Sequence, residues 1–309
     1  MQHRAKPPPG SALIPALVAG LTLSGCPQML DDRFGDPSGF GPDSAQLAGA
    51  GGTGSDFPAA GAAGTEPDPR DASALDAPDT PRTELGELLV HRYRFDRSDS
   101  SVVDSIGDAD GVTRGAVQSN GRVTLTGSNY VELPNGIVSS LASVTLEAWV
   151  TWSADPFSAA SDWQILFSFG TNANGEGRQG SGTTYLALTP KASDSGYIRA
   201  SYTLTGYDDE VYADAADALP TATGTQVVMV VDGAQGSLTV YVNGSLAGTQ
   251  AGLTLDLAAI DDVNNWIGRS QFSVDPNFVG DVLDFRIFDG ALSASQVALS
   301  HTLGANADL

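Results

Sequence analysis

Cys26 is the only cysteine of the chain, and it follows a segment typical of exported proteins. Basic residues near the N-terminus precede an apolar run from Ala12 to Leu23, which is too short to span a bilayer but suits the core of a signal peptide. Ser24 and Gly25 then place small side chains before the thiol, as a peptidase that cuts there requires. A lone thiol cannot form an internal disulfide, so the fold must be held by its core.

The tetrapeptide Leu23-Ser24-Gly25-Cys26 resembles the lipobox of bacterial lipoprotein signal peptides. The resemblance implies that residues 1–25 are removed, that Cys26 receives diacylglycerol, and that the protein is held on a membrane by lipid. Two or three acyl chains anchor a protein stably where one does not. Pro27, in place of Asp, favours the outer membrane within the bacterial cell envelope, on its periplasmic or its outer side. The alternative is an ordinary secretory signal with an incidental cysteine.

Three aspartates, Asp104, Asp108 and Asp110, lie close together in a glycine-punctuated segment and are candidate ligands for Ca²⁺. Carboxylate oxygens are the ligands that this hard cation prefers. The segment is not an EF-hand, because Ile106 occupies an acidic position and the closing glutamate is missing. The alternative is a polar turn in which the aspartates accept hydrogen bonds from backbone amides.

Aromatic side chains beside polar groups are candidate contacts for a sugar. One set surrounds the segment 153–162, and the other adjoins the acidic run Asp208-Asp209-Glu210: Trp152, Phe157 and Trp163, then Tyr207 and Tyr212. The predicted ligand site comprises Trp163, Tyr207, Asp208, Asp209 and Tyr212. In a β-sandwich, aromatic residues are also common in the core, where we place Trp149 and Phe285. The acidic run is interpreted as a solvated loop, with calcium binding as the alternative.

The residue pattern does not predict an enzyme. Retaining glycoside hydrolases need two carboxylates about 5 Å apart, which an alternating pattern such as E-x-D-x-x-E supplies on a strand. The acidic run at 208–210 is contiguous, so neighbouring side chains would face opposite sides of a strand. His3, His91 and His301 lie in the signal or at the ends of the folded region, and no G-x-S-x-G motif is present.

The charge of the chain excludes nucleic acid as a partner. Its 15 basic and 37 acidic residues give a formal net charge of −22. Affinity for a polyanion comes from Lys and Arg that displace counterions, and these residues are few and scattered.

Residues 26–86 are predicted to form a disordered tether. They are rich in Ala, Gly, Pro, Asp and Ser and lack the periodicity of a helix or a strand. A flexible chain of roughly sixty residues has an end-to-end distance of about 40 Å, which suffices to hold a domain clear of a membrane surface.

Residues 87–305 are predicted to form one all-β domain. Short alternating runs such as Val123–Thr126, Tyr130–Leu133 and Val144–Trp152 are separated by turn residues, as in an antiparallel sandwich. Val227–Val231 is apolar throughout, as expected for a strand covered on both faces. Asn243-Gly244 predicts a tight hairpin. The last strand is expected at 281–288, followed by a helix that starts at Ser293.

The order of these segments resembles the laminin-G-like jelly roll of the concanavalin A-like superfamily, over nearly all of residues 88–301. The segments that carry the resemblance are, in order, Tyr93-Arg-Phe-Asp with Val103-Asp104-Ser105 and Gly107, Asn129-Tyr-Val-Glu-Leu-Pro, Val144-Thr-Leu-Glu-Ala-Trp-Val, Leu238-Thr-Val-Tyr-Val-Asn-Gly, Ile267-Gly-Arg, Gly280-Asp-Val-Leu-Asp-Phe-Arg-Ile and Ala291-Leu-Ser-Ala. It implies a two-sheet antiparallel sandwich. The acidic position of the family's last strand is Leu283 here, with Asp284 beside it, which weakens the transfer of a polar-network role to that strand.

Three functions are compatible with these features. The favoured one is a non-enzymatic, lipid-anchored recognition module of the cell envelope that binds carbohydrate or protein, with or without Ca²⁺. The second is a structural envelope protein with no diffusible ligand. The third, which the missing acid pair disfavours, is a glycoside hydrolase.

Overall fold

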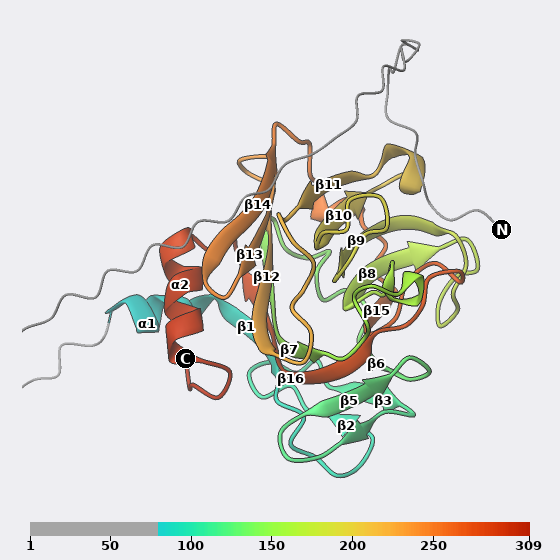
Figure 1. Ribbon diagram of the computed structural model, residues 1–309. Coiled ribbons are helices and arrows are strands. Elements are labelled where there is room, and N and C mark those ends of the chain that lie inside the picture. Colours follow the sequence, from blue (N-terminus) through green and yellow to red (C-terminus); the bar gives the residue numbers. More distant parts are fainter. Residues whose placement is uncertain (1–79) are drawn as a thin grey trace, which may run out of the picture. The chain divides into compact units, whose positions relative to one another are not determined.

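The computed structural model describes residues 80–309, so the predicted signal peptide, Cys26 and residues 27–79 of the tether lie outside the described residues. The described part folds into two antiparallel sheets that pack face to face, with helices beside one of them (Figure 1). This architecture confirms the predicted all-β jelly-roll sandwich. Within residues 80–309, neither helix has the length and apolar character needed to cross a bilayer.

The first sheet, here called sheet A, has β16 and β7 at its centre. Its spatial order is β14 (Ser245–Ala251), β13 (Ser237–Val242), β12 (Gly224–Asp232), β7 (Val144–Trp152), β16 (Val279–Asp289), β5 (Val123–Thr126) and β4 (Val117–Gln118), and β1 (Leu89–Tyr93) pairs with β16.

The second sheet, sheet B, faces the first. Its spatial order is β11 (Val211–Asp214), β10 (Arg199–Thr203), β9 (Gly182–Thr189), β8 (Phe167–Asn172), β15 (Asn264–Ile267), β6 (Tyr130–Leu133), β3 (Gly111–Arg114) and β2 (Ser101–Val102). Short 3₁₀ turns at Ala159–Ser161, Tyr207–Asp209 and Leu257–Ala259 lie between strands.

The main core fills the space between the sheets. Phe285 of β16 contacts Phe167 and Phe169 of β8, with ring centroids 5.4 Å and 6.1 Å apart. All three side chains are fully buried, so these rings join sheet A to sheet B. The predicted core position of Phe285 is confirmed. Aromatic pairs of this kind contribute about 0.5–1.5 kcal/mol beyond the area that they bury.

A second apolar cluster covers the outer face of sheet A. Val228 and Val230 of β12 point away from the main core, toward Leu85 of α1 (Thr80–Leu88) and Val297 of α2 (Ala294–Leu303). Figure 1 shows both helices on the side of sheet A that faces away from sheet B. The stretch Val227–Val231 of β12 is therefore apolar because both faces of the strand are covered there, as its sequence predicts.

The folded region extends beyond the predicted limits of 87 and 305. Helix α1 begins at Thr80, within the segment expected to be tether, because Leu85 has an apolar surface to pack against and is fully buried. At the other end, the carbonyl oxygens of Ala305 and Ala307 accept hydrogen bonds from Arg92, so the chain is held beyond residue 305.

Two local predictions are confirmed by backbone geometry. Asn243 and Gly244 both have positive φ, 49° and 74°, as the type I′ turn between β13 and β14 requires. Ser293 caps α2 through a capping box with Gln296, in which each side chain bonds the other residue's backbone N–H.

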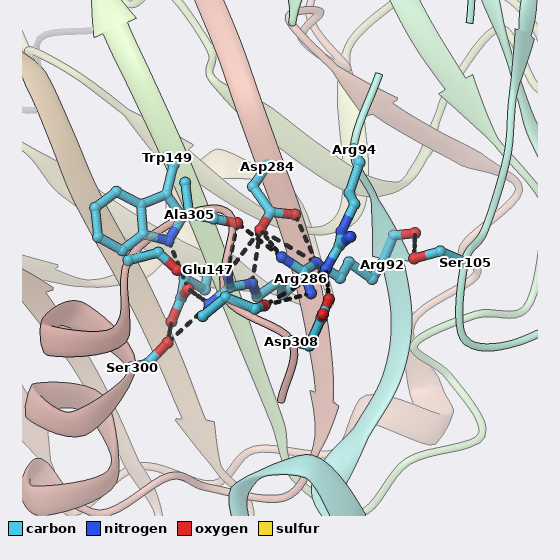
Figure 2. Close-up of polar contacts among 12 residues, drawn as sticks. Arg92, Arg94, Ser105, Glu147, Trp149, Asp284, Arg286, Ser300, Ala305 and Asp308 are labelled. Carbon is cyan, nitrogen blue, oxygen red and sulfur yellow. Dashed lines mark hydrogen bonds and ion pairs between the residues drawn. The ribbon is translucent and has the colours of Figure 1, made fainter. Parts of the chain in front are cut away.

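A buried ionic network ties helix α2 and the C-terminal segment to sheet A (Figure 2). Arg286 of β16 donates to Glu147 Oε1 at 2.8 Å and to Asp284 Oδ2 at 2.8 Å. Arg92 of β1 donates to the same aspartate at 2.8 Å. Ser300 of α2 donates to Glu147 Oε2 at 2.7 Å. The two arginines balance the two carboxylates, so the network buries no net charge.

Asp284 reaches this network through a β-bulge. In the pairing of β16 with β7, Leu283 and Asp284 together stand opposite Trp149, after which Phe285 pairs with Ala148. The extra residue turns Asp284 to the outer face, beside Arg286. The expectation that Leu283 would weaken a polar network on this strand was wrong, because the bulge moves the neighbouring carboxylate into place.

Arg286→Met is expected to lower the free energy of unfolding by about 3–5 kcal/mol, because it leaves Glu147 and Asp284 as buried carboxylates with too few cations. Urea unfolding of the expressed chain measures this loss. The matched control is Arg122→Met, since Arg122 is exposed and pairs with Asp281 at 3.4 Å. That change is expected to cost less than about 1 kcal/mol. Equal effects of the two substitutions would contradict the assigned role of the network.

Candidate functional site

A hollow of about 470 Å³ opens beside Trp163, between the loop that follows β7 and the segment before β16. It is lined by Ala159, Ala160, Asp162, Trp163, Ser193, Val274, Asp275 and Pro276. The size is typical of small-molecule sites. A second hollow of about 520 Å³, near Ser139 and Leu257, has no aromatic side chain in its lining. The hollow beside Trp163 is therefore the better candidate.

Trp163 forms a fixed wall of this hollow. Its backbone has a φ of 60°, a left-handed conformation that a bulky residue rarely adopts and that costs about 1–3 kcal/mol. The backbone N–H donates to Lys191 O at 2.9 Å, and the indole N–H donates to Ser193 Oγ at 2.9 Å. Only 4% of the side chain is exposed. The predicted role of Trp163 as an exposed platform was therefore wrong, although the residue does line the candidate site.

Two carboxylates line the hollow, and one of them is paired with a lysine outside the lining. Lys191 Nζ lies 2.6 Å from Asp162 Oδ1, at the distance of an ion pair but without the alignment of a hydrogen bond. Asp275 accepts a hydrogen bond from Ser270 Oγ at 2.6 Å. The prediction missed Lys191, Asp162 and Asp275, because nothing in their spacing shows that these loops meet.

Two exposed apolar side chains belong to the segments that form the hollow. Phe157, two residues before the lining residue Ala159, is 95% exposed, and its backbone N–H donates to Asp155 Oδ1 at 2.9 Å. Val274, which lines the hollow, is 69% exposed. Phe157 thus has the exposure that the sequence analysis expected of a sugar contact, whereas Trp152 does not. Trp152 is fully buried and donates to Gln164 Oε1 at 3.0 Å.

Trp149 also differs from its prediction. It was placed in the core, but it lies on the outer face of sheet A, half-buried and stacked on His301 with ring centroids 5.6 Å apart. Its indole N–H donates to Glu147 Oε1 at 2.8 Å. Trp149 therefore belongs to the surroundings of the buried ionic network.

Arg199 connects Trp163 with Tyr212 on the outer face of sheet B. Its guanidinium carbon lies 5.5 Å from the centre of the Trp163 ring and 3.8 Å from that of Tyr212. Asp214 accepts from Arg199 Nε and Nη2 at 2.7 Å and 2.8 Å. Burial lowers the pKa of Arg199, but Asp214 and Asp194 outweigh it and raise the pKa above its usual value. Tyr212 is thereby brought next to the wall of the hollow.

The predicted site at Tyr207, Asp208 and Asp209 lies on an exposed 3₁₀ turn. Tyr207 packs edge-on against Phe272 at 6.4 Å and does not line the hollow. Glu210, the next residue, turns toward sheet B and accepts hydrogen bonds from Ser201 and Tyr185. In this acidic run, Asp208 and Asp209 are therefore exposed, whereas Glu210 is bonded to residues of sheet B.

The predicted calcium ligands are arranged as a hydrogen-bonded turn. Asp104 is buried, and its two oxygens accept from His91 Nδ1 and from the backbone N–H groups of Arg92, Ile106, Gly107 and Ala109. Asp110 accepts from the Asp104 N–H at 2.8 Å, and Asp108 is exposed. No cluster of three potential metal ligands occurs among residues 80–309. A cation would have to displace these donors, and the calcium site stays a prediction.

The sequence of the sandwich domain matches the model of a known protein family. A family model described as the concanavalin A-like lectin/glucanases superfamily matches residues 125–298, which is more than half of the chain. No curated protein sequence matches the chain.

Several solved structures share the fold. Domain 4 of AbnA, a GH43 extracellular arabinanase from Geobacillus stearothermophilus in complex with arabinotriose, is 22% identical, with a TM-score of 0.54 over 68% of this chain and 96% of that chain. A Trypanosoma rangeli sialidase in complex with 2,3-difluoro-KDN is 16% identical, with a TM-score of 0.52 over 70% of this chain and 33% of the sialidase chain. The receptor-binding domain of botulinum neurotoxin mosaic serotype C/D is 16% identical, with a TM-score of 0.51 over 71% and 51%. These identities show a shared fold alone.

The Asp104 turn predicts a specific pH dependence of stability. Burial alone would raise the pKa of Asp104, but the bonds from His91 and the backbone N–H groups outweigh it and hold the pKa well below its usual range. The stabilisation is therefore complete above about pH 4, the pKa of an unfolded aspartate, and is lost as pH falls through the folded pKa. Asp104→Asn is expected to cost about 1–3 kcal/mol at pH 7 and less at pH 2, measured by urea unfolding at each pH.

The control for this experiment is Asp99→Asn, because Asp99 is exposed. A constant difference between wild type and Asp104→Asn from pH 7 to pH 2 would contradict the assigned ionised state. Repeating the unfolding in Ca²⁺ and in EDTA tests the calcium site, which requires a higher wild-type midpoint in Ca²⁺ that Asp104→Asn does not show.

Proposed function

The chain belongs to the concanavalin A-like lectin/glucanases superfamily, and on this basis we propose that its folded domain binds carbohydrate in the hollow beside Trp163 without cleaving it. The observation that carries the proposal is Trp163 itself. A bulky side chain held at positive φ, in the wall of a hollow with polar groups around it, indicates a site whose shape is maintained at a cost in stability.

The lining suits the two kinds of surface that a sugar presents. Val274 in the lining, and the exposed Phe157 on the adjoining loop, offer apolar area to the C–H face of a ring. Asp162 and Asp275 offer acceptors to hydroxyl groups, and Ser193 can both donate and accept. In the free protein the Phe157 ring is exposed to water. Packing it against a ligand would therefore bury apolar surface without breaking an existing contact of the ring.

Binding without cleavage is supported by the roles of the carboxylates. Asp162 is paired with Lys191, and Asp275 accepts from Ser270, so each already has a structural partner. Hydrolysis is the second candidate function, because these two carboxylates line the same hollow and glycoside hydrolases act through such a pair. The arabinanase and sialidase among the structural neighbours bear on this chain only through their fold.

Phe157→Ala is expected to weaken glycan binding at least tenfold, since a buried Phe ring contributes about 1.5–3 kcal/mol and each 1.4 kcal/mol is a factor of ten. The measurement is a glycan array with the purified protein, followed by calorimetry on the best ligand, with arabinotriose as a defined probe. Val117→Ala is the matched control, because Val117 is also exposed but lies on β4 of sheet A.

An array with no bound glycan, in Ca²⁺ and in EDTA, would refute carbohydrate binding and leave a structural envelope role or a protein partner. Release of reducing sugar from a bound oligosaccharide, abolished in Asp162→Asn or Asp275→Asn, would establish the hydrolase instead. Loss of binding in Val117→Ala as strong as in Phe157→Ala would place the site elsewhere.

We also propose that lipid on Cys26 displays the domain on the bacterial cell envelope. The sequence Leu23-Ser24-Gly25-Cys26 supports this, and residues 27–79 supply the spacer. A displayed binding domain can reach glycans or envelope proteins close to the membrane without leaving it.

Cys26→Ala is expected to release the protein from the membrane fraction, because the substitution removes the sulfur that would carry the diacylglycerol. Partition of the full chain into detergent, followed by mass spectrometry of its N-terminus, measures this. Ser24→Ala serves as the control, since it keeps a small residue before the cleavage position. Continued detergent partitioning of Cys26→Ala would contradict lipidation.

A further inference from the structure

Arginine and lysine side chains in the described part of this acidic protein nearly all face a carboxylate. Ion pairs involve Arg92, Arg94, Arg97, Arg114, Arg122, Lys191, Arg199 and Arg286. Arg82 instead bonds the carbonyl oxygen of Asp308. Within residues 80–309, Arg178 and Arg269 likewise have no ion pair. The excess of acidic residues makes an unpaired arginine unusual here, and the two lie close in the fold.

Arg269 is held by aromatic rings. Its guanidinium carbon lies 4.2 Å from the centre of the Trp266 ring and 4.4 Å from that of Tyr130. The two rings meet edge to face, 6.0 Å apart at 70°. Cation–π contacts of this kind fix the orientation of a guanidinium without using its N–H donors. The indole N–H of Trp266 is buried and makes no hydrogen bond, so the indole acts here through its face.

The donors of Arg269 are mostly unused. Its one hydrogen bond is a long one, from Nη1 to Gly177 O at 3.5 Å. The nearby carboxylate of Glu132 is taken by Arg114. Arg178 follows Gly177 directly and is exposed. A planar guanidinium with free N–H groups matches a carboxylate through two parallel hydrogen bonds.

Arg269 is linked to the hollow beside Trp163 through the chain. Residues 269–275 run from Arg269 to Asp275, and Ser270, the next residue after Arg269, donates to Asp275 in the lining of the hollow. Phe272, midway along this segment, contacts Tyr185 and Tyr207. A ligand longer than the hollow could therefore follow this segment across the outer face of sheet B.

We propose that Arg269, assisted by Arg178, binds the carboxylate of an acidic saccharide whose neighbouring sugar units occupy the hollow beside Trp163. The inference rests on the proposed carbohydrate binding and names the ligand class. The net charge of −22 repels an anionic ligand at long range. Recognition must come from short-range geometry, and affinity should rise with moderate salt as the repulsion is screened.

The test compares each acidic sugar with its own methyl ester, which removes the charge and adds one small methyl group. Trigalacturonate and methyl β-D-glucuronide are titrated into the ¹⁵N-labelled protein, each beside its ester, while the side-chain N–H signals of Arg269 and Trp266 are followed by NMR. The acids are expected to shift both signals, and the esters to leave them in place. Trigalacturonate is expected to bind at least tenfold more tightly than its ester.

Arg269→Gln is expected to abolish this preference and to keep the affinity for the ester. Arg122→Gln, which changes an exposed arginine on sheet A, is the control and should keep the preference. Thermal unfolding checks that both variants fold. If Arg269→Gln does not fold, the titrations of the wild-type protein decide the question.

Equal binding of acid and ester, with the Arg269 signal unmoved, would overturn this inference and leave carbohydrate binding intact. Binding of the acids that persists in Arg269→Gln would place the carboxylate elsewhere and also overturn it. If neither acid nor ester binds and the glycan array is empty as well, the proposed function itself fails.

Discussion

The buried network around Arg286 is the interaction on which the arrangement of sheet A depends. It joins β1, β7 and β16 to helix α2 and to the C-terminal segment through groups that are far apart in sequence. Each carboxylate in it has an arginine, so the desolvation that isolated charges would suffer is offset only while all members are present. The network thereby closes the outer face of sheet A together with the second apolar cluster.

Closing one face leaves the other available. The outer face of sheet B has only a small apolar cluster of its own, formed by Ile165, Tyr185, Ala187 and Phe272. Around this cluster lie side chains that their neighbours hold in place. Trp163 donates a hydrogen bond to Ser193, and the guanidinium of Arg269 lies over the ring of Trp266. The sandwich therefore has one outer face that is covered by helices and by the ionic network, and another on which the proposed binding site lies.

The strands could be predicted from sequence because alternation and turn chemistry are local properties, as β12 and Asn243-Gly244 show. The same alternation, applied strictly to Val144–Trp152, turns Trp149 outward and Trp152 inward, so those two errors came from treating each tryptophan by type. The residues of the candidate site were harder to predict from the sequence. Lys191 and Asp162, or Arg286 and Glu147, belong to segments that are far apart in sequence, and no local pattern reveals such pairs.

The bulge at Leu283 has a consequence for comparing this chain with its relatives. An alignment without a gap there would match Leu283 to the family's acidic position and conclude that the charge has been lost. In three dimensions the charge is kept, one residue later, because the strand absorbs the extra residue. Positions on β16 are therefore best compared by the side of the sheet that a residue faces, because Leu283 and Asp284 are adjacent in sequence but only Asp284 joins the polar network.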